Sequence, residues 1–172
     1  GWVQPDHPLP YPQNEYPPLV PALIIISNIL INDWFLAGKI IALIFGTITL
    51  MLTYHITKSL IDDKSAIISL LMVGLSLPLI LASTEIRTGI VYTVFLLLSV
   101  FYFIKSNNTR LKNIVYSAIW LGLAFYSRIQ AIFLPIYFFI ATAIYKKEWK
   151  RYLIFLLIFI IIISPWVIKI IV

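Results

Sequence analysis

Long apolar runs separated by short charged clusters are the feature that most restricts how this chain can fold. The runs are about 15 to 23 residues long, and 61% of the chain is hydrophobic while only 12% is charged. A soluble domain of 172 residues cannot bury that much apolar surface. About 20 apolar residues are enough for a helix to cross a bilayer. The sequence therefore predicts an all-α, polytopic transmembrane helical bundle and excludes a soluble globular enzyme.

The apolar runs predict about six spans. The stretch 113–145 would reach about 50 Å as one helix, well beyond a hydrocarbon core of about 30 Å, so we expect a hairpin that turns at Arg128. The run 19–31 has only 13 residues, which favours a short external re-entrant or interfacial helix, although a crossing helix is the alternative. The expected spans are 35–57, 65–84, 88–104, 113–127, 129–145 and 152–172.

The start of the chain differs in composition from the rest. Residues 1–21 hold seven of the ten prolines and no lysine or arginine. Because proline disrupts helices, we expect residues 1–18 to form a proline-rich external loop and residues 19–172 to form the transmembrane domain. The chain begins without methionine and stops inside an apolar run, so we expect a piece of a longer protein, truncated at both ends.

The basic residues predict the orientation in a cell membrane. The net charge is +6, but lysine and arginine lie in the breaks between apolar runs rather than on one basic face, which argues against a nucleic-acid partner. Cytoplasmic loops of membrane proteins are enriched in these residues. We therefore expect one side, with nine of them, to be cytoplasmic, and the side of Lys39, Arg87, Arg128 and Lys169 to be external. The nine are Lys58, Lys64, Lys105, Arg110, Lys112, Lys146, Lys147, Lys150 and Arg151.

This topology collects charged residues from distant parts of the chain on the external side. Charges at the ends of spans are costly unless they face water, a partner or a ligand. Arginine binds phosphate through a planar fork of donors, and a carboxylate can deprotonate a hydroxyl or hold a divalent cation. The set therefore suits an anionic, lipid-linked substrate. Its members are Asp6, His7, Glu15, Glu85, Arg87 and Arg128.

Each candidate also has a plainer interpretation. Arg128 can close a helical hairpin and extend to lipid headgroups. Glu85 and Arg87 can be a solvated pair in a loop, and the acids of a proline-rich loop are often only solvated. His7 is a candidate metal ligand, but it has no second histidine at ligand spacing.

The order of several short motifs resembles a known family. The stretch 15–21, Glu-Tyr-Pro-Pro-Leu-Val-Pro, is similar to the double-proline signature that follows the first external loop of GT-C glycosyltransferases. The relevant branch contains the protein O-mannosyltransferases and the aminoarabinose transferase of lipid A. Further stretches fit this branch over essentially the whole chain. They are Phe45-Gly46-Thr47 before Tyr54, Ala82 to Arg87, Gly122 to Arg128, and Ser164-Pro165-Trp166.

The resemblance implies a GT-C-like fold and transfer of a sugar from a polyprenyl-phosphate donor to a protein, lipid or glycan acceptor on the external face. By resemblance, Arg128 occupies the basic position that binds the donor phosphate. Tyr16 replaces a lysine found near that phosphate. Glu85 stands in for an aspartate that members have just after the position of Arg87. The resemblance implies that Tyr16, Glu85 and Arg87 bind substrate together with Arg128.

The resemblance also implies the catalytic groups. Glu15 matches an acid that helps bind a metal ion in the aminoarabinose transferases, so a divalent metal is the expected cofactor, with His7 as a further candidate ligand, and no organic cofactor is expected. The main catalytic aspartate of the family follows its first span, which is expected to precede Gly1, and Asp6 and Glu15 are the candidates here.

Two other functions remain open at this point. A transporter or flippase would show inverted repeats and helices broken near the midplane, whereas this chain has no convincing repeat and carries its charges at span ends. A non-catalytic membrane scaffold explains the hydrophobicity, but it gives no reason for an acidic, proline-rich loop before a short apolar segment.

Overall fold

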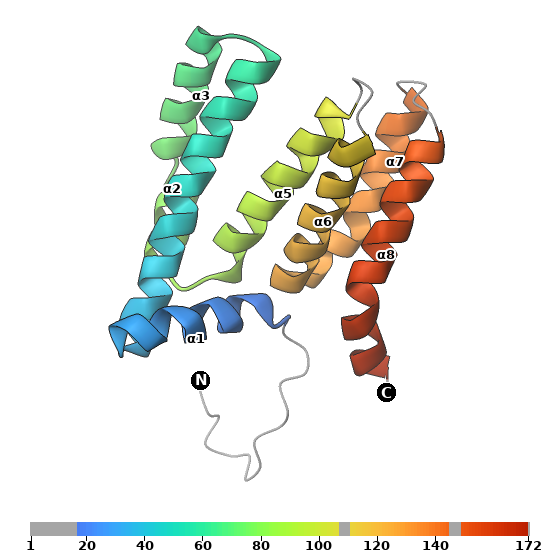
Figure 1. The fold of residues 1–172 in the computed structure, drawn as a ribbon. Helices are drawn as coiled ribbons and strands as arrows, with labels where there is room; N and C mark the ends of the chain where they lie inside the picture. The colour runs from blue at the N-terminus through green and yellow to red at the C-terminus, as the bar shows by residue number, and fades with distance from the viewer. Residues whose placement is uncertain (1–16, 107–110, 145–148, 172) are drawn as a thin grey trace.

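The computed structural model describes residues 17–106, 111–144 and 149–171. Within these ranges every regular element is a helix, which confirms the all-α class of a membrane helical bundle. Figure 1 shows the longer helices side by side, with α1 lying across one end of them. The elements are α1 (Leu19–Ile31), α2 (Trp34–Leu60), α3 (Asp63–Gly74), α4 (Leu77–Thr84), α5 (Thr88–Lys105), α6 (Leu111–Ser127), the 3₁₀ helix η1 (Ile129–Phe133), α7 (Leu134–Ile144) and α8 (Trp149–Ile171).

The number of full-length spans is lower than the six expected. Over the described residues, α2, α5 and α8 are long and apolar enough to cross a membrane, and α3 with α4 makes a fourth span if the bent pair counts as one. α6 has 17 residues, and the apolar segment of η1 and α7 is also shorter than a full span. Within the described residues three or four segments therefore reach the length of a full span, against the six expected, because the turn at Arg128 and the 3₁₀ segment after it take residues from the helices on either side.

A tight turn sets α1 across the end of α2. Asn32 closes α1 in the left-handed conformation, with φ of 54°, and its N–H donates to the carbonyl of Asn28. Asp33 then caps α2, where its carboxylate accepts from the N–H groups of Phe35 and Leu36 at 2.9 and 3.0 Å. Asparagine tolerates positive φ and aspartate is a favoured N-cap, so these two neighbouring residues allow the sharp change of direction between α1 and α2.

The expected straight span 65–84 is broken between α3 and α4. The two helices meet at an angle of 61°. In a continuous helix the ring of Pro78 would clash with the carbonyl of Gly74, four residues earlier, and would leave that carbonyl without its donor. The chain instead ends α3 at Gly74 and places Pro78 in the first turn of α4, where proline is tolerated.

A reciprocal pair of serine bonds joins α5 to α6. The hydroxyl of Ser99 donates to the carbonyl of Ser117 at 2.9 Å, and the hydroxyl of Ser117 donates to the carbonyl of Ser99 at 2.8 Å. Both side chains are fully buried. Small residues with such bonds let two membrane helices approach closely. α6 also packs closely on α8, since a Cβ at Gly122 would collide with Ile162, and the Tyr126 hydroxyl donates to the Ile162 carbonyl at 2.9 Å.

The aromatic core lies between α5, α7 and α8. The rings of Phe103 and Phe138 stack with centroids 4.2 Å apart, and Phe155 meets both rings edge-on. A second, smaller cluster contains Val20 of α1 with Ile90 of α5, so the start of α1 is packed against the first turn of α5. The two clusters hold both ends of α5 in place.

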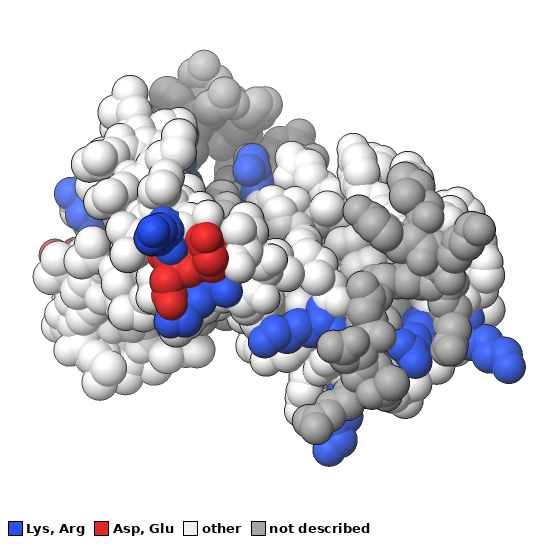
Figure 2. All heavy atoms as spheres, turned by 90° about the horizontal axis from the view of Figure 1, so that it is seen from above, with Lys and Arg blue, Asp and Glu red and all other residues white. Residues whose placement is uncertain are grey.

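The bundle has two chemically different ends. The lysine-rich end contains the turn from α2 to α3, the end of α5 and the starts of α6 and α8 (Figure 1). Figure 2 shows basic side chains on this end, some beside a small acidic group and others apart from it. At this end Ser65 hydrogen-bonds to the Asp62 carboxylate, which holds the pKa of Asp62 below its usual value. The opposite end, called the arginine end below, holds α1, Arg87 and Arg128. The described basic residues of the lysine-rich end are Lys58, Lys64, Lys105, Lys112, Lys150 and Arg151.

The contact between α2 and α4 generates the first prediction. A Cβ on Gly46 would lie 2.6 Å from the Cβ of Ser83, whereas a Cβ on Gly74 would be 3.4 Å from the end of the Leu50 side chain. We expect Gly46→Ala to destabilise the protein by about 1–3 kcal/mol, because overpacking forces α4 away from α2. Gly74→Ala is the matched control and should unfold at or slightly above the wild-type temperature, because alanine favours helix. Thermal unfolding of both variants in detergent measures the difference. Equal stability of the two variants would contradict the tight contact.

Candidate functional site

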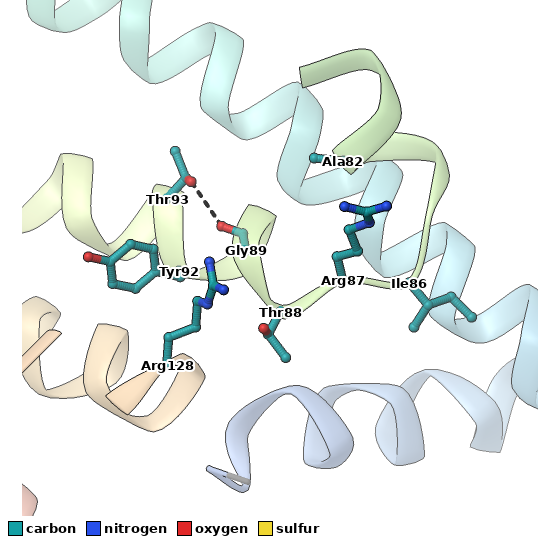
Figure 3. Close-up of a pocket in the computed structure, with 8 residues that line it drawn as sticks. All are labelled: Ala82, Ile86, Arg87, Thr88, Gly89, Tyr92, Thr93 and Arg128. Carbon is teal, nitrogen blue, oxygen red and sulfur yellow. Dashed lines mark hydrogen bonds between the residues drawn. The ribbon is translucent and has the colours of Figure 1, made fainter. Parts of the chain in front are cut away.

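The arginine end contains a cavity between α4, α5 and the turn after α6. Its volume is about 600 Å³. Figure 3 shows that its walls come from the α4–α5 link, from the first turns of α5 and from the side chain of Arg128. We call it the arginine cavity. It is lined by Ala82, Ile86, Arg87, Thr88, Gly89, Tyr92, Thr93 and Arg128.

Arg128 reaches the cavity from the end of α6. Its backbone is extended, with φ of −150° and ψ of 128°, and is held by a bond from its N–H to the Ala124 carbonyl at 2.9 Å. The side chain is exposed and extends past Gly89, where a Cβ would be 3.6 Å from Nη1 (Figure 3). With the residues described here the guanidinium makes no hydrogen bond or ion pair, and the side chain forms part of the cavity wall.

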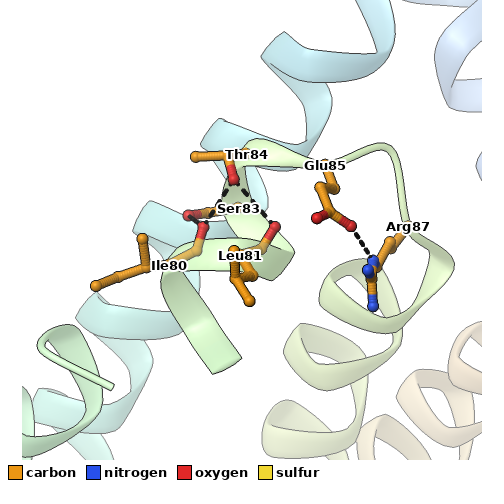
Figure 4. A network of polar contacts seen from close by, with 6 residues as sticks. All are labelled: Ile80, Leu81, Ser83, Thr84, Glu85 and Arg87. Atoms are coloured by element: carbon orange, nitrogen blue, oxygen red, sulfur yellow. Dashed lines mark hydrogen bonds and ion pairs between the residues drawn. The ribbon is translucent and has the colours of Figure 1, made fainter. Parts of the chain in front are cut away.

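Arg87 enters the same cavity from the other side. It is the N-cap residue of α5, and its Nε is paired with the Glu85 carboxylate (Figure 4). The side chains of Arg87 and Glu85 are 62% and 43% exposed, so the pair is solvated and contributes little to stability. Glu85 therefore offsets part of the positive charge of Arg87 and limits where its guanidinium lies.

The first turn of α5 adds to the positive potential. The N-cap Arg87 makes no side-chain capping bond, and the first N–H groups of a helix have no partner within the helix. They carry a partial positive charge that favours an anion. Two arginines and a helix N-terminus therefore line one cavity, and each of these groups favours an anion such as phosphate.

A second hollow adjoins the arginine cavity. Its volume is about 320 Å³, and Thr88 and Arg128 line both spaces. Pro17, the first residue that the structure describes, is part of its wall. We call it the smaller hollow. Its lining is Pro17, Thr88, Ser127, Arg128, Ile129, Gln130 and Phe133.

The structure brings together three of the seven predicted site residues. Arg87 and Arg128 line one cavity, and Glu85 is paired with Arg87. The other four predicted residues lie outside the described part of the chain, so the roles expected for them stay predictions. Among the described residues no group of three or more histidines and acids is placed to hold a metal ion. The four are Asp6, His7, Glu15 and Tyr16.

Sequence reasoning missed three polar residues of the arginine cavity, Thr88, Tyr92 and Thr93. Thr88 and Tyr92 are four residues apart on α5 and line the cavity from the same helix face. The sequence signal for these two residues is their position just after Arg87 and their separation of four residues, because residues four apart share a helix face.

The sequence model of one family, the dolichyl-phosphate-mannose-protein mannosyltransferases, matches residues 15–168. The chain belongs to this family. The match begins at Glu15 and includes both arginines of the cavity, and it confirms the resemblance seen in the motifs. No curated protein and no solved structure matches the chain.

Membership in the mannosyltransferase family implies membrane glycosyltransferase activity. The family in general uses a dolichyl- or polyprenyl-phosphate sugar as the donor.

The Glu85–Arg87 pair generates the second prediction. Glu85→Gln removes the carboxylate that offsets Arg87, so a short polyprenyl phosphate should bind up to about fivefold more tightly at low salt, with a smaller gain at high salt. Titration of the full-length protein that contains this chain measures the dissociation constant. Asp63→Asn, at the lysine-rich end, is the matched control and should leave binding unchanged. Weaker binding by Glu85→Gln would instead show that the carboxylate holds Arg87 in its binding position.

Proposed function

We propose that this chain is the membrane part of a glycosyltransferase that moves a sugar from a polyprenyl-phosphate donor to an acceptor hydroxyl at the arginine end, on the external face of the membrane. The observation that carries the proposal is that Arg87 and Arg128 line the same cavity at the N-terminus of α5. The family match supports it, because members use a donor of this class.

The arginines act on the leaving group. When the bond between the anomeric carbon and the phosphate oxygen breaks, negative charge grows on the departing polyprenyl phosphate. Fixed positive groups near that oxygen lower the barrier, because they stabilise charge that develops in the transition state. Arg128 faces the cavity without an acidic partner among the described residues, so it is the principal group, and Arg87 assists it.

A carboxylate completes the reaction by taking the proton of the acceptor hydroxyl as the oxygen attacks the anomeric carbon. Asp6 and Glu15 are our candidates for this base. In the sequence, Glu15 is two residues before Pro17, which lines the smaller hollow. Glu15 with His7 is also our candidate pair for a divalent metal ion.

Release of polyprenyl phosphate tests this proposal. The full-length protein is offered a panel of polyprenyl-phosphate sugars, and wild type is compared with Arg128→Ala, Arg128→Lys and Glu15→Gln. We expect Arg128→Ala and Glu15→Gln each to slow release at least about tenfold, or 1.4 kcal/mol of barrier. Arg128→Lys should be intermediate, because lysine keeps the charge without the fork of donors.

Lys169→Ala is the matched control for charge. Lys169 lies in the last turn of α8 at the same end of the bundle, over the ring of Trp166, and it lines neither the arginine cavity nor the smaller hollow. Its loss should leave release unchanged. Release that is unchanged in Arg128→Ala would show that the site does not lie at the arginine end. A folded protein that releases nothing from any donor would favour transport instead.

The orientation of the bundle provides a separate prediction. The positive-inside rule places the lysine-rich end in the cytoplasm. The chain has no cysteine, so single cysteines at Gln13 and Asn107 can be labelled with an impermeant maleimide in intact cells. We expect labelling at 13 and none at 107. The reverse pattern would put the arginine end inside and contradict an external site.

A further inference from the structure

We propose that Tyr126 is a positioning residue for the arginine cavity. Its hydroxyl ties the last turn of α6 to α8, and this tie holds the Arg128 guanidinium in place. The inference rests on the proposed function, because it names a further residue on which phosphate binding at Arg128 depends. Tyr126 lines neither the arginine cavity nor the smaller hollow, so it acts on a ligand there only through a neighbouring residue.

Two motifs of the family resemblance meet at one residue of α8. The first is the stretch 122–128, and the second is the stretch 164–166, which Ile162 precedes by two residues. A Cβ on Gly122 would collide with the Ile162 side chain, and the Tyr126 hydroxyl donates to the Ile162 carbonyl at 2.9 Å. Gly122 and Tyr126 are four residues apart and share a helix face. One face of α6 therefore contacts both the side chain and the backbone of Ile162.

A proline makes this part of α8 receptive to hydroxyl donors. Pro165 lies inside the helix and has no N–H, so the Ile161 carbonyl, four residues earlier, lacks its helical donor. The Ser164 hydroxyl donates to that carbonyl instead, at 2.9 Å. In a membrane, backbone groups freed by a proline are satisfied by side chains of the same or a neighbouring helix. Ser164 and Tyr126 thus supply hydroxyls to two successive carbonyls before the proline.

The last turn of α6 depends on this tie because the serine bonds to α5 are distant. Ser117 lies ten residues before the end of α6 at Ser127, or about 15 Å along the helix. The Ser127 hydroxyl donates within its own helix, to the Leu123 carbonyl at 3.2 Å. The ends of helices open more readily than their centres. The serine pair therefore sets where α6 ends beside α5, and Tyr126 keeps that end from moving.

Arg128 follows this turn directly and takes its orientation from it. The Arg128 N–H is bonded back to the Ala124 carbonyl at 2.9 Å, one residue pair before the Tyr126 tie. Its guanidinium lies beside Gly89 and is bonded to none of the described side chains. Because the arginine side chain is long, a small rotation of the last turn displaces the guanidinium from the position in which it binds phosphate.

A double-mutant cycle on binding of farnesyl phosphate tests the inference. The full-length protein is compared in nanodiscs as wild type, Tyr126→Phe, Arg128→Ala and the double variant. Tyr126→Phe keeps the ring and removes the hydroxyl alone. We expect Arg128→Ala to weaken binding at least about tenfold and Tyr126→Phe about fivefold. In the Arg128→Ala background Tyr126→Phe should have no further effect, because a residue that acts through Arg128 has no effect in its absence.

Tyr116→Phe is the matched control. Tyr116 lies on the same helix, is 46% exposed, and makes no hydroxyl bond to the described residues. Its variant should bind farnesyl phosphate as wild type does. Replacement of Tyr126 by 4-aminophenylalanine, which has an N–H donor in place of the hydroxyl, should restore the affinity to within about twofold of wild type.

Gly122→Ala disturbs the same contact by a second route. The added Cβ pushes Ile162, and with it the accepting carbonyl, away from α6. We expect a similar loss of affinity, again absent in the Arg128→Ala background, and recovery when Ile162→Ala makes room. Each variant is compared with its own Arg128→Ala partner, so one folded variant is enough for the test.

The outcomes separate the inference from the proposed function. Equal losses with and without Arg128, or no loss in either Tyr126→Phe or Gly122→Ala, overturn the inference and leave the phosphate site at Arg128 intact. Wild-type affinity in Arg128→Ala, or no binding by the folded wild type, overturns the proposed function itself.

Discussion

The close contact of α5 and α6 is the constraint on which the rest of the arginine end depends. Ser99 and Ser117 exchange hydroxyl-to-carbonyl bonds in a fully buried interface, which fixes the register of the two helices as well as their separation. In lipid, apolar side chains gain little by leaving the solvent, so small residues and polar bonds of this kind decide which helices associate. The last residue of α6 is thereby held beside the first turn of α5, and Arg128, the next residue, extends past Gly89. The position of one guanidinium is thus set by two serines deep in the bundle.

The second guanidinium depends on a different device. The chain bends between α3 and α4 at Pro78, and the short α4 packs against α2, where Ser83 lies very close to Gly46. This path delivers Arg87 to the N-cap of α5 from the side opposite Arg128. A broken helix and a helix-to-helix contact therefore contribute separately to one electropositive space, and neither could place both arginines alone.

Much of the helix pattern follows from the sequence. The short helix at 19–31 and the turn at Arg128 lie where apolar run length placed them, since a run far longer than a bilayer must turn and a 13-residue run stands apart. The break after Gly74 was missed, because hydropathy continues through Pro78 without a polar signal. The pairing of Arg87 with Glu85, and the sharing of Arg128 by two spaces, depend on side-chain directions that linear spacing does not contain. Run length fixes where helices exist, whereas close contacts at glycine and serine fix how they meet.

The crosswise helix α1 puts an apolar face at the end of the bundle where the site opens. Ile25, Ile26, Ile29 and Leu30 on its outer face are between 52% and 88% exposed. A face this apolar is stable against hydrocarbon rather than water. Pro17 and the smaller hollow lie at the start of the same helix. In the transferase proposed above, the opening beside Arg128 lies at the same end of the bundle as this apolar helix, so an acceptor has to approach the bilayer closely, as a lipid does by nature and a protein does only through an extended or anchored segment.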